Sequence, residues 1–274
     1  MIAAGEAGAF DQNHVQWDQV LKGYSHEGFV NYKKLKAEPK ILDQYLDSLA
    51  GLKESEYKAW KREDQIAFWI NAYNALTVKA ILDHYPIKSS WAASLRFPKN
   101  SIRQIPGVWD KLQFTVIGRK ISLNEIEHET LRKQFKEPRA HMALVCASIG
   151  CPPLRGEAYT SVGLESQLDD QAKRFLENPA KFKIDKENKR MSMVSGIEVE
   201  ARQPIFLSPI FKWFGEDFKN AYPAKEGFGD HGTTEKAVLN FISRYVSQQD
   251  RPYLLKGNYD IKYLNYDWSL NESK

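Results

Sequence analysis

The sequence is poor in cysteine, with two among its 274 residues. Two cysteines are too few for a small secreted scaffold in which several disulfides replace a hydrophobic core. The sequence also lacks any run of about 18 apolar residues, so we predict no segment that spans a membrane. Because 42% of the residues are hydrophobic and 12% are aromatic, we expect the chain to fold around a core of its own.

Lysine and arginine form no continuous run in this chain. They number 39 against 35 aspartates and glutamates, they are spread among these acids, and the formal net charge is +4. Nucleic-acid-binding surfaces need basic residues gathered on one face. The sequence therefore does not predict nucleic acid as a partner.

The first residues, MIAAGEAGAFDQNH, lack the hydrophobic region of an intact signal peptide. Small residues of this kind remain beside a cleavage site, and they are also typical of a cloning remnant on a cytosolic protein. We expect residues 1–15 to form a flexible tail. Residues 16–274 are expected to form a single globular domain.

Apolar spacing predicts helices and short strands in irregular order. The strongest helix covers about residues 64–85, where apolar side chains point in nearly every direction, so we expect it to be buried at the centre. Ser122 and Glu125 have the spacing of a capping box and predict the start of another helix. Residues 113–123 predict a hairpin, and residues 140–146 predict a buried strand. The predicted fold class is α+β, with a small, mainly antiparallel sheet packed by several helices.

Two asparagines interrupt the apolar surface of the central helix. Asn71 and Asn74 are three residues apart and share one side of it. A buried amide without a partner costs about 1–3 kcal/mol, so we expect both to be hydrogen-bonded. They either tie neighbouring backbone to the helix, or line a cleft and orient a substrate or a catalytic histidine.

A carboxylate interrupts the apolar stripe of the helix that follows Ser122. At about 100° per residue, Glu127 falls in the middle of that stripe, and His128 lies at its edge. An inward carboxylate must be paired or have a raised pKa. We therefore expect low exposure for Glu127 and a donor from a histidine, an arginine or backbone amides, as a structural pair or as part of a site.

Both cysteines fall in one stretch, RAHMALVCASIGCPPLRGEAY, together with His141 and Ser148. If the chain up to Cys146 is a regular strand, His141 and Cys146 face opposite sides of it. A base for Cys146 must then come from another element, and His128 is the nearest candidate.

Several chemistries remain open for the two sulfurs. Cys146 is a candidate nucleophile, if a histidine lies within reach and the pKa of its thiol is lowered. A disulfide to Cys151 requires a turn that brings the two Cα atoms about 4.4–6.8 Å apart. A zinc site with His141 lacks the usual cysteine spacing and a fourth ligand. A redox role for the two cysteines ranks below the nucleophile and the disulfide, because redox pairs usually use C-x-x-C. If none of these chemistries applies, both thiols are buried core residues.

Five blocks resemble, in order, the family called domain of unknown function 547: AFWINAYNALTVKAILDHYP, ISLNEIEHETLR, RAHMALVCASIGCPPLRGEAY, LSPIFKWFGEDF and YDWSLN. The resemblance covers about Trp17 to Asn271 and implies one domain. It also implies a bacterial member that is exported, periplasmic or secreted, with its signal peptide removed and a mature form that starts near Phe10. It supplies no established reaction.

The residues and the resemblance together predict a polar cleft that takes a peptide or small-molecule ligand. The leading hypothesis is a thiol- or carboxylate-dependent hydrolase or acyl transferase acting on a peptide or small amide. The alternative is a non-catalytic ligand- or protein-binding module with a Cys146–Cys151 disulfide. Neither hypothesis calls for a metal or a cofactor. The candidate catalytic residues are Cys146, His128, His141 and Glu127, and the candidate binding residues are Asn71, Asn74, Ser148 and Cys151.

Overall fold

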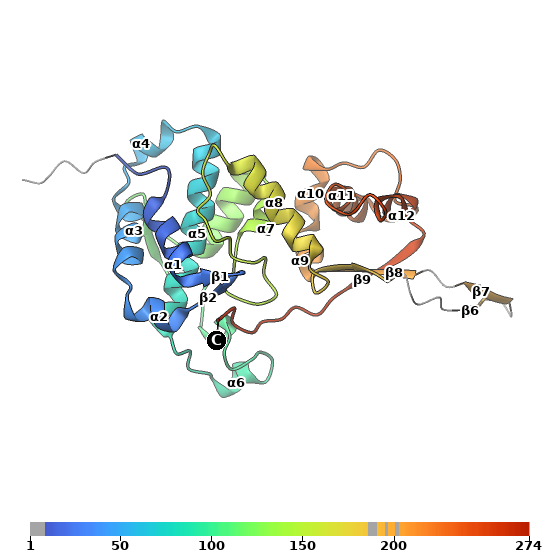
Figure 1. Cartoon of the computed structure of the whole chain (residues 1–274), viewed down its shortest axis with the longest axis horizontal. Coiled ribbons are helices and arrows are strands. Elements are labelled where there is room, and N and C mark those ends of the chain that lie inside the picture. The colour runs from blue at the N-terminus through green and yellow to red at the C-terminus, as the bar shows by residue number, and fades with distance from the viewer. Residues whose placement is uncertain (1–8, 186–190, 195–196, 201–202, 274) are drawn as a thin grey trace, which may run out of the picture. The chain divides into compact units, whose positions relative to one another are not determined.

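The computed structural model describes residues 9–185, 191–194, 197–200 and 203–273 (Figure 1). The chain divides into two compact units. Unit 1 comprises Met1–Phe135, Ala143–Gln167 and Trp268–Lys274, and unit 2 comprises Lys136–Met142 and Leu168–Asp267. The α+β class is confirmed. A single domain over residues 16–274 stays a prediction, and the two units are described separately.

Unit 1 is mainly helical. Its helices are α1 (Val15–Tyr24), α2 (Tyr32–Ala37), α3 (Lys40–Gly51), α4 (Glu54–Lys58), α5 (Arg62–His84), α6 (Trp91–Ser94), the short 3₁₀ helix η1 (Ile102–Gln104) and η2 (Glu125–Phe135). Its strands form two antiparallel hairpins: β1 (Ser25–His26) with β2 (Phe29–Val30), and β3 (Phe114–Val116) with β4 (Arg119–Ile121). Two helices contain residues of both units: α7 (Ala140–Ala143) and α8 (Leu164–Glu177).

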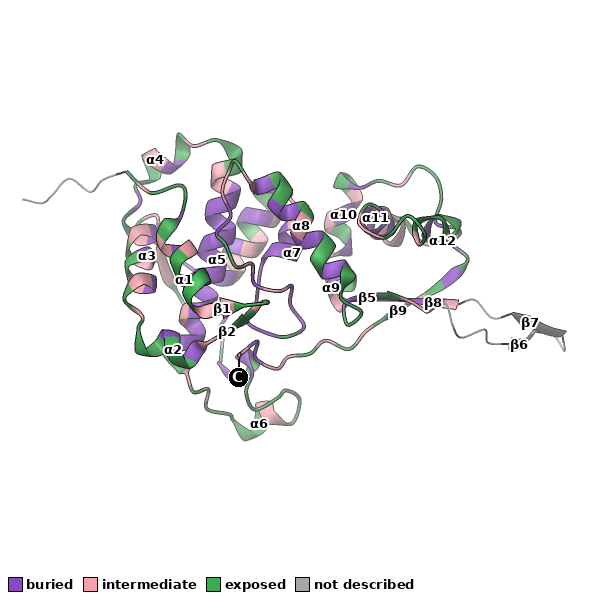
Figure 2. Ribbon diagram, viewed as in Figure 1, coloured by how far each residue is buried: buried purple, intermediate pink, exposed green. Residues whose placement is uncertain are grey.

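Helix α5 lies at the centre of unit 1. Nearly all its residues from Ile66 to Leu82 are buried (Figure 2), as expected for a helix that is apolar all round. It ends at His84, two residues before Pro86, which disfavours helical backbone at the preceding Tyr85. The predicted central helix is therefore confirmed.

Two local signals of unit 1 are also confirmed. The Ser122 N–H donates to Glu125 Oε2 (2.7 Å), and the Glu125 N–H donates to Ser122 Oγ (3.2 Å), so the capping box forms. The predicted hairpin turns at Ile117 (φ 52°) and Gly118 (φ 68°). Two consecutive positive φ values are what a tight two-residue hairpin turn requires.

Unit 2 combines a small sheet with short helices. Its sheet has the order β5–β8–β9, with β5 (Phe182–Ile184) antiparallel and β9 (Tyr259–Tyr263) parallel to β8 (Gln203–Leu207). A separate antiparallel pair joins β6 (Met191–Val194) and β7 (Ile197–Glu200). The remaining helices are α9 (Pro209–Trp213), α10 (Gly215–Ala221), α11 (Thr233–Ile242) and α12 (Arg251–Lys256). Its core is rich in phenylalanine: Phe175, Phe211, Phe218 and Phe241 are all buried.

The strand predicted for residues 140–146 is wrong. Ala140–Ala143 form the helix α7 rather than the start of a strand, because a turn begins at Glu137 and the Ala140 N–H donates to its carbonyl. A short apolar run does not separate strand from helix by periodicity alone. Within the predicted tail, the Phe10 N–H donates to Glu56 Oε1 (2.8 Å) and His14 is buried, and the flexibility of residues 1–15 stays a prediction. Residues 1–8 lie outside the described residues. Among the described residues, none of the helices has the length and hydropathy needed to cross a bilayer.

Candidate functional site

The two asparagines of α5 each hold a segment of backbone from much later in the chain. Asn71 Nδ2 donates to the Tyr159 carbonyl (2.7 Å), and the Tyr159 N–H donates to Asn71 Oδ1 (3.0 Å). Asn74 Nδ2 donates to the Ala143 carbonyl (3.0 Å), and the Val145 N–H donates to Asn74 Oδ1 (2.9 Å). Both amides are buried and hydrogen-bonded, as predicted. Both asparagines therefore tie neighbouring backbone to the helix, the first of the two roles considered for them.

Cys146 and Cys151 form a disulfide, with their Cα atoms 6.2 Å apart. The Cys146 N–H donates to Cys151 Sγ (2.9 Å), and Ser148 Oγ lies 3.2 Å from Cys146 Sγ and 3.4 Å from Cys151 Sγ. Cys151 is buried, whereas Cys146 is half-buried. Among the described residues, no group of three histidine, cysteine, aspartate or glutamate side chains is placed to hold a metal ion. Among the alternatives for the two cysteines, the structure therefore contains the Cys146–Cys151 disulfide.

The backbone inside the disulfide loop is fixed by the C-terminal residues of unit 1. The Asn271 N–H donates to the Ala147 carbonyl (3.1 Å), and the Ile149 N–H donates to the Ser269 carbonyl (2.8 Å). Ala147 has a φ of 55°, in the left-handed region that favours glycine. A non-glycine residue there costs on the order of 1–3 kcal/mol and persists only where surrounding contacts impose it. The disulfide and the C-terminal segment supply those contacts.

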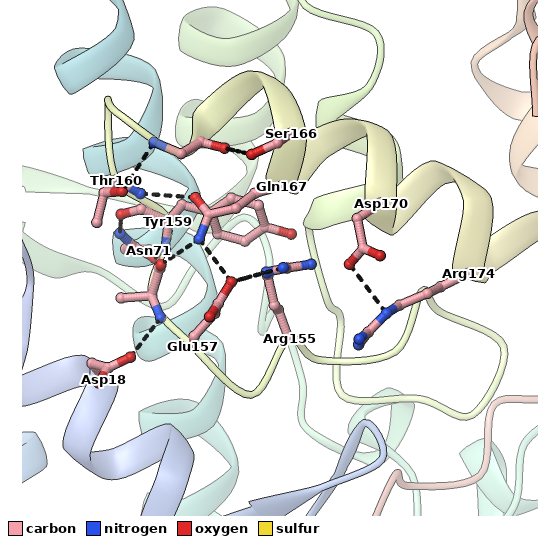
Figure 3. Close-up of polar contacts among 12 residues, drawn as sticks. Asp18, Asn71, Arg155, Glu157, Tyr159, Thr160, Ser166, Gln167, Asp170 and Arg174 are labelled. Carbon is pink, nitrogen blue, oxygen red and sulfur yellow. Dashed lines mark hydrogen bonds and ion pairs between the residues drawn. The ribbon is translucent and has the colours of Figure 1, made fainter.

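The loop that follows the disulfide is held by one glutamine of α8 (Figure 3). Gln167 Oε1 accepts from the Thr160 N–H (3.0 Å), and its Nε2 donates to the Ala158 carbonyl (2.9 Å) and to Glu157 Oε1 (3.1 Å). Arg155 Nη2 donates to the same Glu157 oxygen (2.7 Å). The Arg155 guanidinium and the Gln167 amide lower the pKa of the Glu157 carboxyl. The side chains of Gln167 and Arg155 thus hold the loop in place through hydrogen bonds to its backbone and to Glu157.

Glu127 and His128 have partners of their own in unit 1. The Tyr73 hydroxyl donates to Glu127 Oε2 (3.2 Å), and Glu127 is half-buried. The predicted kind of donor is wrong, because a tyrosine takes that place. Helix η2 has π-type hydrogen bonding, whereas the predicted position of Glu127 assumed the 100° per residue of an α-helix. Arg132 Nη1 donates to His128 Nδ1 (2.9 Å).

His141 belongs to a polar cluster of unit 2. Its Nε2 donates to Asp217 Oδ2 (2.7 Å), and its ring stacks on Phe214 with centroids 4.1 Å apart. A carboxylate on one imidazole nitrogen orients the ring and selects the tautomer. Two residues earlier, Arg139 makes two 2.9 Å hydrogen bonds to the Glu137 carboxylate. The His141–Asp217 pair has the arrangement that orients a histidine as a general base.

The structure brings three of the candidate residues together. Cys146, Ser148 and Cys151 form one turn, and Asn74 binds the backbone immediately before it. The other candidates have partners on other elements, so one polar cleft shared by all eight stays a prediction.

Two polar residues with prominent contacts were missed in the sequence analysis. Asp217 pairs with His141 across 76 residues, and Gln167 anchors the loop after the disulfide. The block LSPIFKWFGEDF contains Asp217 and is the sequence signal that points to it. For Gln167, a glutamine on the amphipathic helix α8 gave no comparable signal.

Comparison with known proteins gives one match. Residues 57–176 match the model of a family described as protein of unknown function, DUF547. This range contains all eight candidate residues, and it is shorter than the range over which the sequence blocks resemble the family. No curated protein and no solved structure matches the chain.

Proposed function

Residues 57–176 belong to the DUF547 family of proteins of unknown function, and we propose that the chain is a non-catalytic ligand- or protein-binding module built around the Cys146–Cys151 disulfide. The observation that carries this proposal is the disulfide itself. A thiol hydrolase or acyl transferase needs a thiolate on Cys146. In the disulfide that sulfur is bonded to Cys151 and is no nucleophile.

The surroundings of the disulfide support a structural staple. Asn74 fixes the backbone before the turn, and the C-terminal segment binds the backbone within it. Ile149, at the tip of the turn, is 41% exposed while its N–H is held by the Ser269 carbonyl. A large apolar side chain presented from a rigid turn keeps the entropic cost of binding low. We place the contact surface of the module at this tip.

The disulfide also supports export. Disulfides persist in the periplasm and outside the cell and are rare in the cytosol. We therefore propose that the protein is periplasmic or secreted. Protein made in an oxidising compartment should carry the Cys146–Cys151 bond in full, and protein made in a reducing cytosol should carry it partly or not at all.

Alkylation with iodoacetamide, read by intact-protein mass spectrometry, separates the module from the thiol enzyme. We expect no adduct on the native protein and two adducts after reduction and unfolding. The non-reduced protein should also show no burst of p-nitrophenol from p-nitrophenyl acetate, since no thiolate is available to be acylated. One alkylated cysteine in the native protein, with a burst that disappears in Cys146→Ser, would establish the enzyme instead.

Selection from a phage-displayed library of linear random peptides tests the binding surface. Peptides enriched on the wild-type protein should lose binding to Ile149→Glu and to the Cys146→Ser/Cys151→Ser double variant. Val162→Glu is the matched control, because Val162 is fully exposed and lies outside the turn. Equal enrichment on all four proteins would contradict a binding surface at the disulfide turn.

A further inference from the structure

Unit 1 exposes two large apolar side chains at α6. Trp91 is 81% exposed and Leu95 is 68% exposed. Trp91 begins α6, and Leu95 follows its last residue with helical backbone (φ −69°, ψ −22°), so their four-residue spacing places them on the same side of this helical turn. Isolated exposed apolar residues need no explanation, but a tryptophan and a leucine that project together mark an interaction surface.

Hydrogen bonds from the side chain of Gln104 hold the exposed tip formed by Trp91 and Leu95 in place. The Ser90 N–H donates to Gln104 Oε1 (2.9 Å), and Gln104 Nε2 donates to the Pro98 carbonyl (3.0 Å) and to Ser94 Oγ (3.3 Å). Gln104 is itself buried. Because these bonds brace α6 from behind, the exposure of the tip is a fixed feature of the fold.

Cationic residues flank the tip along the chain. Residues 84–109 contain Lys88, Arg96, Lys99 and Arg103 and no aspartate or glutamate. All four cations are exposed. The acidic residue that hydrogen-bonds to this stretch is Glu272, which accepts from the Tyr85 hydroxyl and from Asn100 Nδ2. The cations are spaced along the chain, so they form no run in the sequence, yet they flank the apolar tip.

We propose that this α6 surface (Lys88, Trp91, Leu95, Arg96 and Lys99) docks on an anionic lipid bilayer. Trp91 and Leu95 enter the interface between headgroups and acyl chains, where tryptophan is favoured. The flanking cations bind the phosphate headgroups, each contributing electrostatic attraction to the negative surface. A bilayer fits better than an acidic protein because the two apolar side chains project from a single helical turn, which a deformable surface accommodates. The attachment is peripheral and does not depend on the function proposed for the disulfide turn.

Sedimentation with vesicles of equimolar phosphatidylglycerol and phosphatidylcholine tests the proposal. The full chain should bind these vesicles, should not bind pure phosphatidylcholine, and should dissociate as salt rises. Replacing Lys88, Arg96 or Lys99 singly by glutamine should weaken partitioning by about fivefold each. The Trp91→Ala/Leu95→Ala double variant should weaken it by at least about tenfold.

Two controls and a second readout make the result decisive. Lys120→Gln and Val162→Ala make comparable changes at exposed positions outside the α6 surface and should leave partitioning unchanged. Brominated lipid should quench tryptophan fluorescence in the wild-type protein and quench it less in Trp91→Phe. Absence of binding to anionic vesicles would overturn the proposal. Binding that depends on the lysines and arginine but is unaffected by Trp91→Ala/Leu95→Ala would overturn it too, because the apolar tip would then not enter the bilayer.

Discussion

Asn74→Ala is expected to destabilise the protein strongly, because the amide of Asn74 is hydrogen-bonded to two buried backbone groups. The Ala143 carbonyl accepts from its Nδ2 and the Val145 N–H donates to its Oδ1. Asn74 is 2% exposed, so solvent does not readily replace either contact. Each buried group left without a partner costs about 1–3 kcal/mol. For the two groups together we expect the free energy of unfolding to fall by about 2–6 kcal/mol.

Urea unfolding followed by circular dichroism measures this loss, and hydrogen exchange at the Val145 amide reports it locally. Asn74→Asp keeps the volume of the side chain but turns an acceptor toward the Ala143 carbonyl, so it should cost as much as alanine. Thr77→Val, on the next turn of α5, is the matched control. Thr77 is buried and its Oγ1 has no hydrogen-bond partner among the described residues, so this change should be neutral or stabilising. A loss below about 0.5 kcal/mol for Asn74→Ala would refute the reasoning.

Two further changes test other parts of unit 1. The Cys146→Ser/Cys151→Ser double variant should lose about 2 kcal/mol of unfolding free energy. This is the loop entropy that a disulfide closing a short loop removes from the unfolded chain. A reductant should have no further effect on the stability of this variant. Burial lowers the pKa of His14 to about 4, against the opposing charges of Asp11 and Asp64. The unfolded chain therefore binds a proton first as the pH falls, so stability is complete above about pH 6.5 and should decrease by about 3 kcal/mol toward pH 4. His14→Asn should remove most of this dependence, and an unchanged pH profile would assign it to other groups.

Local signals accounted for much of unit 1. The capping box at Ser122 formed because its two partners are three residues apart. The all-round apolar pattern predicted a buried α5, and the expectation that Asn71 and Asn74 are hydrogen-bonded followed from the cost of burying an unpaired amide. Each of these inferences used residues within a turn or two of one another.

The composition and periodicity of the sequence by themselves determined the α+β class, the central helix and the stretch that holds both cysteines. Tertiary structure alone decided which atoms meet. Asn74 reaches the chain about 70 residues later, and His141 pairs with Asp217 across 76 residues. Whether residues 140–146 became helix or strand depended on the turn at Glu137 and on packing, because a short apolar run satisfies both periods. Cys146 and Cys151 became a disulfide because the turn between them, with Ala147 in the left-handed region, brought their backbones together. Contacts between distant residues carry no periodic signal in the chain, so a sequence names the residues of a site before it can say which of them touch.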